Sequence, residues 1–203
     1  VELCEGLLEI RKDAFRECKA LTNITIPSAI TIIHKGAFAV CVSLEEVELP
    51  EGLREIRSKA FDCCIHLKRI CLPNSVEHIG EDAFQGCKIT SFRIPPLITT
   101  ISSGRICHHP SMCSIEIPES VTRIEEMVFG FCLVLRNMAL PPDVVIEDKF
   151  DMCTDLQQLF GSGTNITNAL KHRFDNLPIH KMIYYQSYNN VTSDELNNAT
   201  DIR

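Results

Sequence analysis

The chain has 203 residues, a net charge of −7 and an isoelectric point near 5.5. This acidic balance argues against duplex nucleic acid as a partner, because a phosphate backbone needs a basic surface. Hydrophobic residues make up 45% of the sequence. They are spread along the chain, and no stretch approaches the roughly 18 unbroken apolar residues of a membrane-spanning helix, so no membrane span is expected.

An internal repeat organises residues 1–160. Prolines that end an apolar triplet recur at intervals of 23, 23, 22, 23 and 23 residues. An isoleucine follows each proline after six residues, or after five in the last repeat. A phenylalanine column and a cysteine column follow at fixed offsets. The prolines are Pro27, Pro50, Pro73, Pro95, Pro118 and Pro141, the main phenylalanines are Phe15, Phe38, Phe61, Phe84 and Phe129, and the column cysteines are Cys18, Cys41, Cys64, Cys87, Cys132 and Cys153, with His109 in the fifth layer.

Each unit reads L-x-x-I-x-I/L-P-x-x-(V/L/I)-x-x-I-x-x-x-A-F-x-x-C. The alternation before the proline predicts a short strand, which the proline ends because it cannot donate a hydrogen bond to a ladder. The A-F-x-x-C segment is interpreted as a short helical turn that points its phenylalanine inward. One such unit cannot bury a core alone, so the sequence predicts an α/β repeat solenoid in which stacked units build a continuous core and a parallel sheet.

With these motifs, residues 1–160 resemble the leucine-rich repeat, specifically its BspA-like class. The resemblance implies a right-handed coil with one short parallel strand and one short helical turn per repeat of about 23 residues. It also implies a role in protein binding or in adhesion at a cell surface. One departure is that no asparagine follows the strand, so the cysteine column replaces the usual asparagine ladder.

Three segments are expected along the chain. Residues 1–160 form an array of about seven repeats, of which the first is incomplete, so that the chain reads as a fragment of a longer protein. Residues 161–167 contain Gly161-Ser162-Gly163 and are expected to be a linker. Residues 168–203 are expected to be helical, either as a cap over the last repeat or as the start of an ankyrin-like module, which Leu177-Pro178-Ile179-His180 resembles.

The cysteines and one histidine cluster raise the questions of metal binding and cellular location. The stretch from Cys107 to Cys113 reads C-H-H-P-S-M-C, but the repeat register turns its side chains in different directions, so it is interpreted as a degenerate repeat and no metal or other cofactor is expected. Eleven cysteines without paired spacing favour the cytoplasm, as buried thiols in a reducing compartment. Four glycosylation sequons, beginning at Asn23, Asn165, Asn190 and Asn198, keep an extracellular or cell-surface location open.

Binding, rather than catalysis, is the predicted function. No nucleophile, metal-protease or phosphate-loop motif is present, so no enzyme activity is expected. The outward residues of the strands are the binding candidates for a protein or peptide, while the competing interpretation is that acidic and basic layers pair with each other on a solvated face. A cell-surface adhesion or matrix-binding protein is the alternative function. The candidate partner-binding residues are Glu45, Glu46, Glu48, Lys68, Arg69, Arg93, Glu116 and Arg136.

Overall fold

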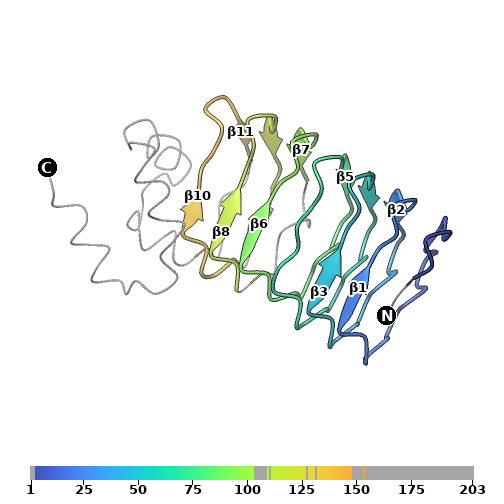
Figure 1. Cartoon of the computed structure of the whole chain (residues 1–203). Helices are drawn as coiled ribbons and strands as arrows, with labels where there is room; N and C mark the ends of the chain where they lie inside the picture. Colours follow the sequence, from blue (N-terminus) through green and yellow to red (C-terminus); the bar gives the residue numbers. More distant parts are fainter. Residues whose placement is uncertain are drawn as a thin grey trace, which may run out of the picture. The chain divides into compact units, whose positions relative to one another are not determined.

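A computed structural model describes residues 3–102, 109, 111–126, 128–130, 132–147 and 153 of the chain. The chain divides into two compact units, Val1–Lys171 and His172–Arg203, and all described residues belong to the first. They form a parallel β-solenoid in which each turn of the coil is one sequence repeat (Figure 1). The predicted solenoid with stacked parallel strands is therefore confirmed for the described part of the chain.

The strand before the proline, where a repeat forms one, has the alternation that the sequence predicts. In β1 (Asn23–Thr25) the central Ile24 is buried and its two neighbours are exposed, because successive side chains point to opposite sides of a strand. The pairing Ile24↔Val47 joins equivalent positions one repeat apart, so the period of the sequence sets the register of the sheet. The other strands of this front sheet are β3 (Glu46–Glu48), β6 (Ser91–Arg93), β8 (Ser114–Glu116) and β10 (Asn137–Met138).

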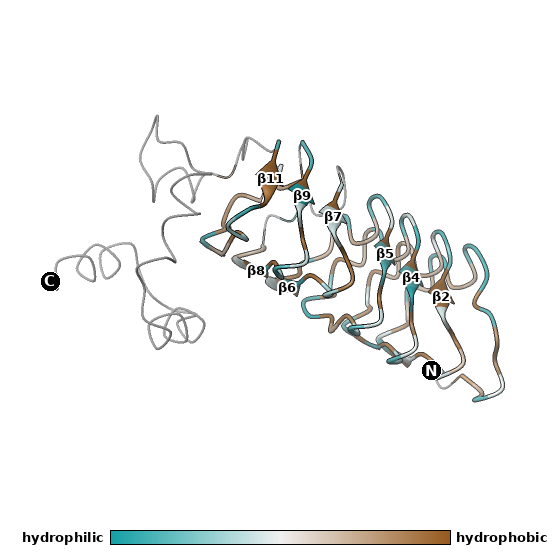
Figure 2. Cartoon of the chain, turned by 90° about the horizontal axis from the view of Figure 1, so that it is seen from above, coloured by the Kyte–Doolittle hydropathy of each residue, from teal (hydrophilic) through white to brown (hydrophobic). Residues whose placement is uncertain are grey.

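A second set of strands carries the isoleucine column from Ile33 to Ile146, while Ile10 forms an isolated parallel bridge with Ile33. The expectation of one strand per repeat is therefore wrong. Ile33 and Ile56 pair in parallel and are completely buried, and a two-residue strand suffices to align each such isoleucine with the next. The strands of this second sheet are β2 (Ile32–Ile33), β4 (Glu55–Ile56), β5 (His78–Ile79), β7 (Thr100–Ile101), β9 (Arg123–Ile124) and β11 (Val145–Ile146), seen side by side in Figure 2.

The segment around each phenylalanine forms turns, so the predicted helical turn is also wrong: no helix occurs among the described residues. A helix is absent from these described segments because several of their backbone amides donate hydrogen bonds to a different layer. The N–H of Phe38 donates to the carbonyl of Ala60 at 2.8 Å, and the N–H of Phe61 donates to that of Ala83 at 2.7 Å. These amides bind the next layer rather than a carbonyl four residues back, which a helix would require. The turns thus add a third ladder of bonds between layers.

Left-handed residues on both sides of the phenylalanine also prevent a helix. In the second layer Gly36 has φ 66° and Val40 has φ 61°, and the next layer has the same conformation at Lys59 and Cys63. Such values are rarely adopted by residues with a side chain and interrupt a right-handed helix. Glycine at position 36 fits this requirement, whereas a β-branched residue at position 40 adopts it at a cost.

Stacked phenylalanines form the centre of the core. Neighbouring rings lie parallel, with centroids 5.1 Å apart for Phe15 and Phe38, 5.3 Å for Phe38 and Phe61 and 5.5 Å for Phe61 and Phe84. The last three of these side chains have no exposed surface. Rings at this spacing attract each other beyond the area that they bury, so the predicted alignment of phenylalanines in successive layers is confirmed and stabilises the stack.

Both sheets are interrupted near the repeat that is one residue short. The front sheet divides into β1-β3 and β6-β8-β10, and the second sheet into β2-β4-β5 and β7-β9-β11. Between β3 and β6 the chain segment 69–72 forms no strand, and no backbone N–H in it donates to a backbone carbonyl within the described residues. Figure 2 shows β5 and β7 set apart where the second sheet stops and resumes. Most layers are held together by three ladders of backbone hydrogen bonds, from the front sheet, the second sheet and the phenylalanine turns. Neither sheet is continuous across this junction.

The predictions for the end of the chain lie outside the described residues. These are the linker at residues 161–167 and the helical cap or ankyrin-like module at residues 168–203. Within the described residues the structure contains no helix that is long and apolar enough to cross a membrane.

Gly80 tests how tightly the layers approach each other. A Cβ atom at this position would lie 2.7 Å from the carbonyl carbon of Arg57 and 2.8 Å from the Cα atom of Ser58 in the preceding layer. We therefore expect Gly80→Ala to lower the free energy of unfolding by about 1–3 kcal/mol, since backbone has to move. The measurement is urea denaturation followed by circular dichroism.

Gly52→Ala is the matched control. Its Cβ atom would meet only the carbonyl oxygen of Ser28, at 3.7 Å, which is an ordinary contact. We expect a change within about 0.5 kcal/mol. Equal effects of the two substitutions would show that the layers are not packed as closely at Gly80 as the structure indicates.

Candidate functional site

The exposed and half-buried residues of the front sheet and those directly preceding its strands, together with those of segment 67–73, form a surface that we call the front face. Its residues flank one buried apolar side chain in each layer, so they do not contribute to the core. Seven of the eight predicted binding residues are exposed on this surface, and Arg136 is half-buried: the exposed residues are Glu45, Glu46, Glu48, Lys68, Arg69, Arg93 and Glu116.

Three glutamates form an acidic row in one layer of the front face. Glu46 and Glu48 lie at the two ends of β3, and Glu45 directly precedes them. In the preceding layer the hydroxyl group of Thr25 donates a hydrogen bond of 2.9 Å to Oε2 of Glu48. The side chains of Glu45 and Glu46 form no ion pair or side-chain hydrogen bond within the described residues. Two of the three carboxylates are therefore open to a partner.

The next layer presents Lys68 and Arg69, which we call the basic pair. Both are exposed, and neither forms an ion pair or side-chain hydrogen bond within the described residues. They occupy the positions that correspond, one repeat later, to Glu45 and Glu46. Opposite charges thus stand in adjacent layers without pairing across the layers. The basic pair lies where the front ladder is interrupted, beside the backbone of segment 69–72.

Further along the front face, two predicted binding residues do pair with each other. Nε of Arg93 lies 3.3 Å from Oε1 of Glu116, and the register places these residues directly opposite each other in β6 and β8. Their side chains are 65% and 62% exposed, so the pair contributes little to stability. The interpretation that neighbouring charges neutralise each other is correct for this pair but not for Lys68 and Arg69.

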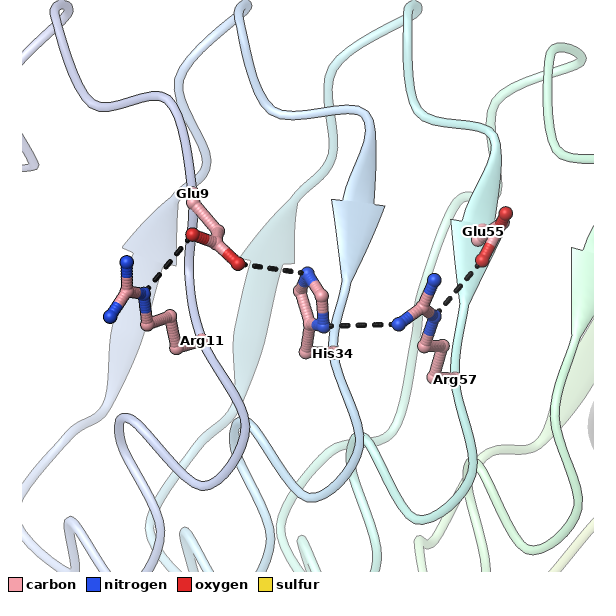
Figure 3. A network of polar contacts seen from close by, with 5 residues as sticks. All are labelled: Glu9, Arg11, His34, Glu55 and Arg57. Carbon is pink, nitrogen blue, oxygen red and sulfur yellow. Dashed lines mark hydrogen bonds and ion pairs between the residues drawn. The ribbon is translucent and has the colours of Figure 1, made fainter.

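A polar network that sequence reasoning missed lies on the second sheet (Figure 3). Nε of Arg11 lies 3.1 Å from Glu9, which contacts Nε2 of His34 at 3.5 Å, and His34 Nδ1 contacts Arg57 at 3.2 Å. Arg57 in turn lies 3.0 Å from Glu55. The signal was present as the triplet Glu-Ile-Arg, which occurs at residues 9–11 and 55–57 around the isoleucine column.

The acidic and basic groups of this network pair with each other. Two arginines face two glutamates, and His34 bridges them if its Nε2 carries the proton, donating to Glu9 and accepting from Arg57. The groups join three successive layers across the second sheet. The front face and the second sheet therefore differ: charges on the second sheet are paired within the molecule, while the acidic row and the basic pair are not.

Four of the column cysteines, Cys41, Cys64, Cys87 and Cys153, donate to backbone carbonyls of another layer. Sγ of Cys41 donates to the carbonyl of Phe15 at 3.1 Å, and Sγ of Cys64 donates to that of Phe38 at 3.2 Å. Burial raises the pKa of the Cys41 thiol from 9.0 to about 12, and the hydrogen bond with Cys87, together with burial, raises the pKa of Cys64 further. Both thiols remain protonated at neutral pH. The prediction of buried structural thiols is confirmed for Cys41, Cys64, Cys87, Cys132 and Cys153, but it is wrong for Cys18, which is exposed in the first described layer.

The predicted degenerate repeat is described only in part. His109 is buried in the layer position of the column cysteines, as the register predicts, while Cys113 donates its thiol proton to the carbonyl of Thr90 at 3.1 Å. Cys107 and His108 lie outside the described residues. Among the residues that are described, no three His, Cys, Asp or Glu side chains gather as metal ligands.

Comparison with known proteins agrees with this architecture. The family model described as "BspA type Leucine rich repeat region (6 copies)" matches residues 1–111 and 89–203. The chain belongs to this family. No curated protein gives a significant sequence match. Membership confirms the resemblance to BspA-like leucine-rich repeats, and it gives the coil a name without specifying a ligand.

Several solved structures are similar to this BspA-type chain, to different degrees. The crystal structure of T. pallidum leucine-rich repeat protein (TpLRR) is similar with a TM-score of 0.70 and 26% identity, over 93% of this chain and 83% of that one. A leucine-rich repeat protein from Bacteroides ovatus ATCC 8483 has a TM-score of 0.59 and 24% identity, over 74% of this chain and 48% of that one. A leucine rich cell surface protein from Faecalibacterium prausnitzii A2-165 has a TM-score of 0.40 and 22% identity, over 80% of this chain and 66% of that one. This similarity is too distant to assign a location to this chain.

Proposed function

We propose that this chain is a non-catalytic scaffold that binds a protein or peptide on its front face. The observation that carries the proposal is the acidic row beside the basic pair, exposed in adjacent layers and not paired with each other. Charges that a fold leaves uncompensated are available to a partner. A surface with both signs side by side orients a partner that carries the opposite arrangement, and this favours specificity over affinity.

The proposed site is centred on two layers. Glu45 and Glu46 would receive cationic groups of the partner, and Lys68 and Arg69 would receive anionic groups about one layer spacing away, near 4.8 Å. Glu48 shares its carboxylate with Thr25, and Arg93 with Glu116 is already paired, so these residues would contribute to the margin of the site. Arg136 is half-buried in the last described layers and would lie at its periphery.

The test is the simultaneous substitution of Glu45, Glu46, Lys68 and Arg69 by alanine. Net charge is unchanged because two acidic and two basic groups are removed together. We expect the variant to lose the proteins that the wild-type chain retains from an extract of its native cells, while its thermal unfolding stays within about 0.5 kcal/mol of wild type, since all four side chains are exposed. The measurement is affinity capture followed by mass spectrometry.

A matched control removes the same charges from the second sheet. Arg54, Glu55, Arg57 and Glu77 supply two bases and two acids there, and they already form ion pairs within the chain. Their replacement by alanine should leave the captured proteins unchanged. The proposal fails if the front-face variant retains every partner, or if both variants lose the same ones.

Adhesion or matrix binding at a cell surface is the second candidate function. It would use the same front face outside the cell. Its support is membership of the BspA-type family and the position of Asn23, which begins a glycosylation sequon and is exposed on β1. Nothing in the described residues or in the comparisons supports the cytoplasmic location that the cysteines led us to expect.

Thiol titration of protein isolated from its native source distinguishes the two locations. Before unfolding, Cys41, Cys64 and Cys87 should react slowly, because all three side chains are buried and donate to backbone carbonyls of a neighbouring layer. After unfolding, all eleven cysteines should titrate as free thiols if the protein resides in a reducing compartment. Fewer than eleven free thiols, together with a glycan on Asn23, would place the chain outside the cell.

A further inference from the structure

The two central layers of the front face carry both halves of a complementary pair. The acidic row lies in one layer and the basic pair in the next, at equivalent positions of the repeat. Neither Glu45 with Glu46 nor Lys68 with Arg69 uses its charge within the described part of the chain. A surface of this kind is complementary to a reversed copy of itself.

We propose that the front face binds a second copy of this chain, forming a two-fold dimer; this inference rests on the proposed binding function. In a two-fold interface, if one residue contacts a second, the second also contacts the first. An axis parallel to the strands, placed between the acidic row and the basic pair, brings Glu45 opposite Lys68 of the second copy. The same rotation brings Glu46 opposite Arg69 of the second copy, and each pairing occurs twice.

The charge pattern also selects the orientation. If the two-fold axis ran along the solenoid instead, every layer would face its own equivalent, and Glu45, Glu46 and Glu48 would oppose the same three carboxylates. Like charges placed directly opposite each other are unfavourable. With the axis parallel to the strands, each acidic layer faces a basic one, so the contacts between like charges become contacts between opposite charges.

Neighbouring layers are compatible with this arrangement. The layer before the acidic row carries Thr22, Asn23 and Thr25, and it would face Thr90, Ser91 and Arg93 of the second copy. These are mostly short polar side chains, which allow close approach without burying an unpaired carboxylate. Figure 2 shows the layers following one another in a nearly straight row, so that two front faces can meet over several layers.

The physical character of the contact determines its behaviour in solution. Exposed ion pairs each contribute little and are screened by salt, and the front face presents few apolar groups to bury. The dimer should therefore be weak and favoured at low ionic strength. We expect its dissociation constant to rise by about tenfold between roughly 0.05 and 0.5 M salt.

Charge exchange between two variants tests the proposal. One variant carries Glu45→Lys with Glu46→Lys, and the other carries Lys68→Glu with Arg69→Glu. Each alone should associate at least about tenfold more weakly than wild type, because like charges meet on both sides of the axis. An equimolar mixture should recover the dimer, since the lysines of the first variant then face the glutamates of the second. Sedimentation velocity at low salt gives the masses.

The control reverses a pair on the second sheet. Arg54→Glu with Glu77→Arg exchanges two charges whose side chains lie 3.6 Å apart, and the variant should dimerise like wild type. Circular dichroism confirms that every variant is folded. Should a reversal prevent folding, Glu45→Gln with Glu46→Gln replaces it, and this variant should also weaken association.

Two results would overturn the dimer. The first is a wild-type chain that stays monomeric at low salt throughout the concentration series, and the second is a mixture of the two reversed variants that fails to associate better than either alone. If the wild type is monomeric but the fourfold alanine variant still loses its captured proteins, the proposed binding function stands and the second copy is not its partner.

Discussion

Backbone hydrogen bonding between successive layers is the constraint on which the rest of this structure depends. Each repeat donates from its phenylalanine turn to the next repeat, as Phe38 does to Ala60, and the two strands add further bonds on either side. A repeat can satisfy its amides only if its neighbour has the same length and conformation. The regular proline spacing, the left-handed turn residues and the stacked phenylalanine rings all follow from that requirement.

Sequence reasoning succeeded where side chains repeat and failed where backbone geometry decides. The alignment of Phe38, Phe61 and Phe84 and the outward position of Glu45 and Lys68 follow from periodicity alone. A helical turn was predicted for each A-F-x-x-C segment, with its phenylalanine pointing inward. The amides there bind the next layer instead, a non-local preference that a single repeat cannot reveal.

The exposure of the candidate binding residues was predictable from the sequence, but the ion pairs among them were not. The register alone identifies which residues face outward, and seven of the eight chosen are exposed. It does not show which charges meet: Arg93 reaches Glu116, but the basic pair reaches no carboxylate in the described residues. Side-chain reach and the local course of the backbone decide this, and the interruption at segment 69–72 had no visible sign beyond a nearby repeat that is one residue short.

The residues that hold the layers together differ from those exposed on the front face. Turns, isoleucines and column cysteines hold the layers together, so the front face can vary without loss of the fold. Charges on the second sheet are largely consumed in contacts such as that of Arg57 with Glu55. Within the described residues, uncompensated charge remains on the front face, concentrated in two layers, and this distribution is the observation on which the proposed binding function rests.

Amide hydrogen exchange, resolved by residue with NMR, tests the layered hydrogen bonding most directly. The amides of Phe38, Phe61 and Glu45, which donate to a neighbouring layer, should exchange slowly, and those of Arg69, Ile70 and Cys71 should exchange at least about tenfold faster. Equal protection of both groups would contradict the interrupted front ladder, and rapid exchange at Phe38 and Phe61 would contradict the stacking of the repeats itself.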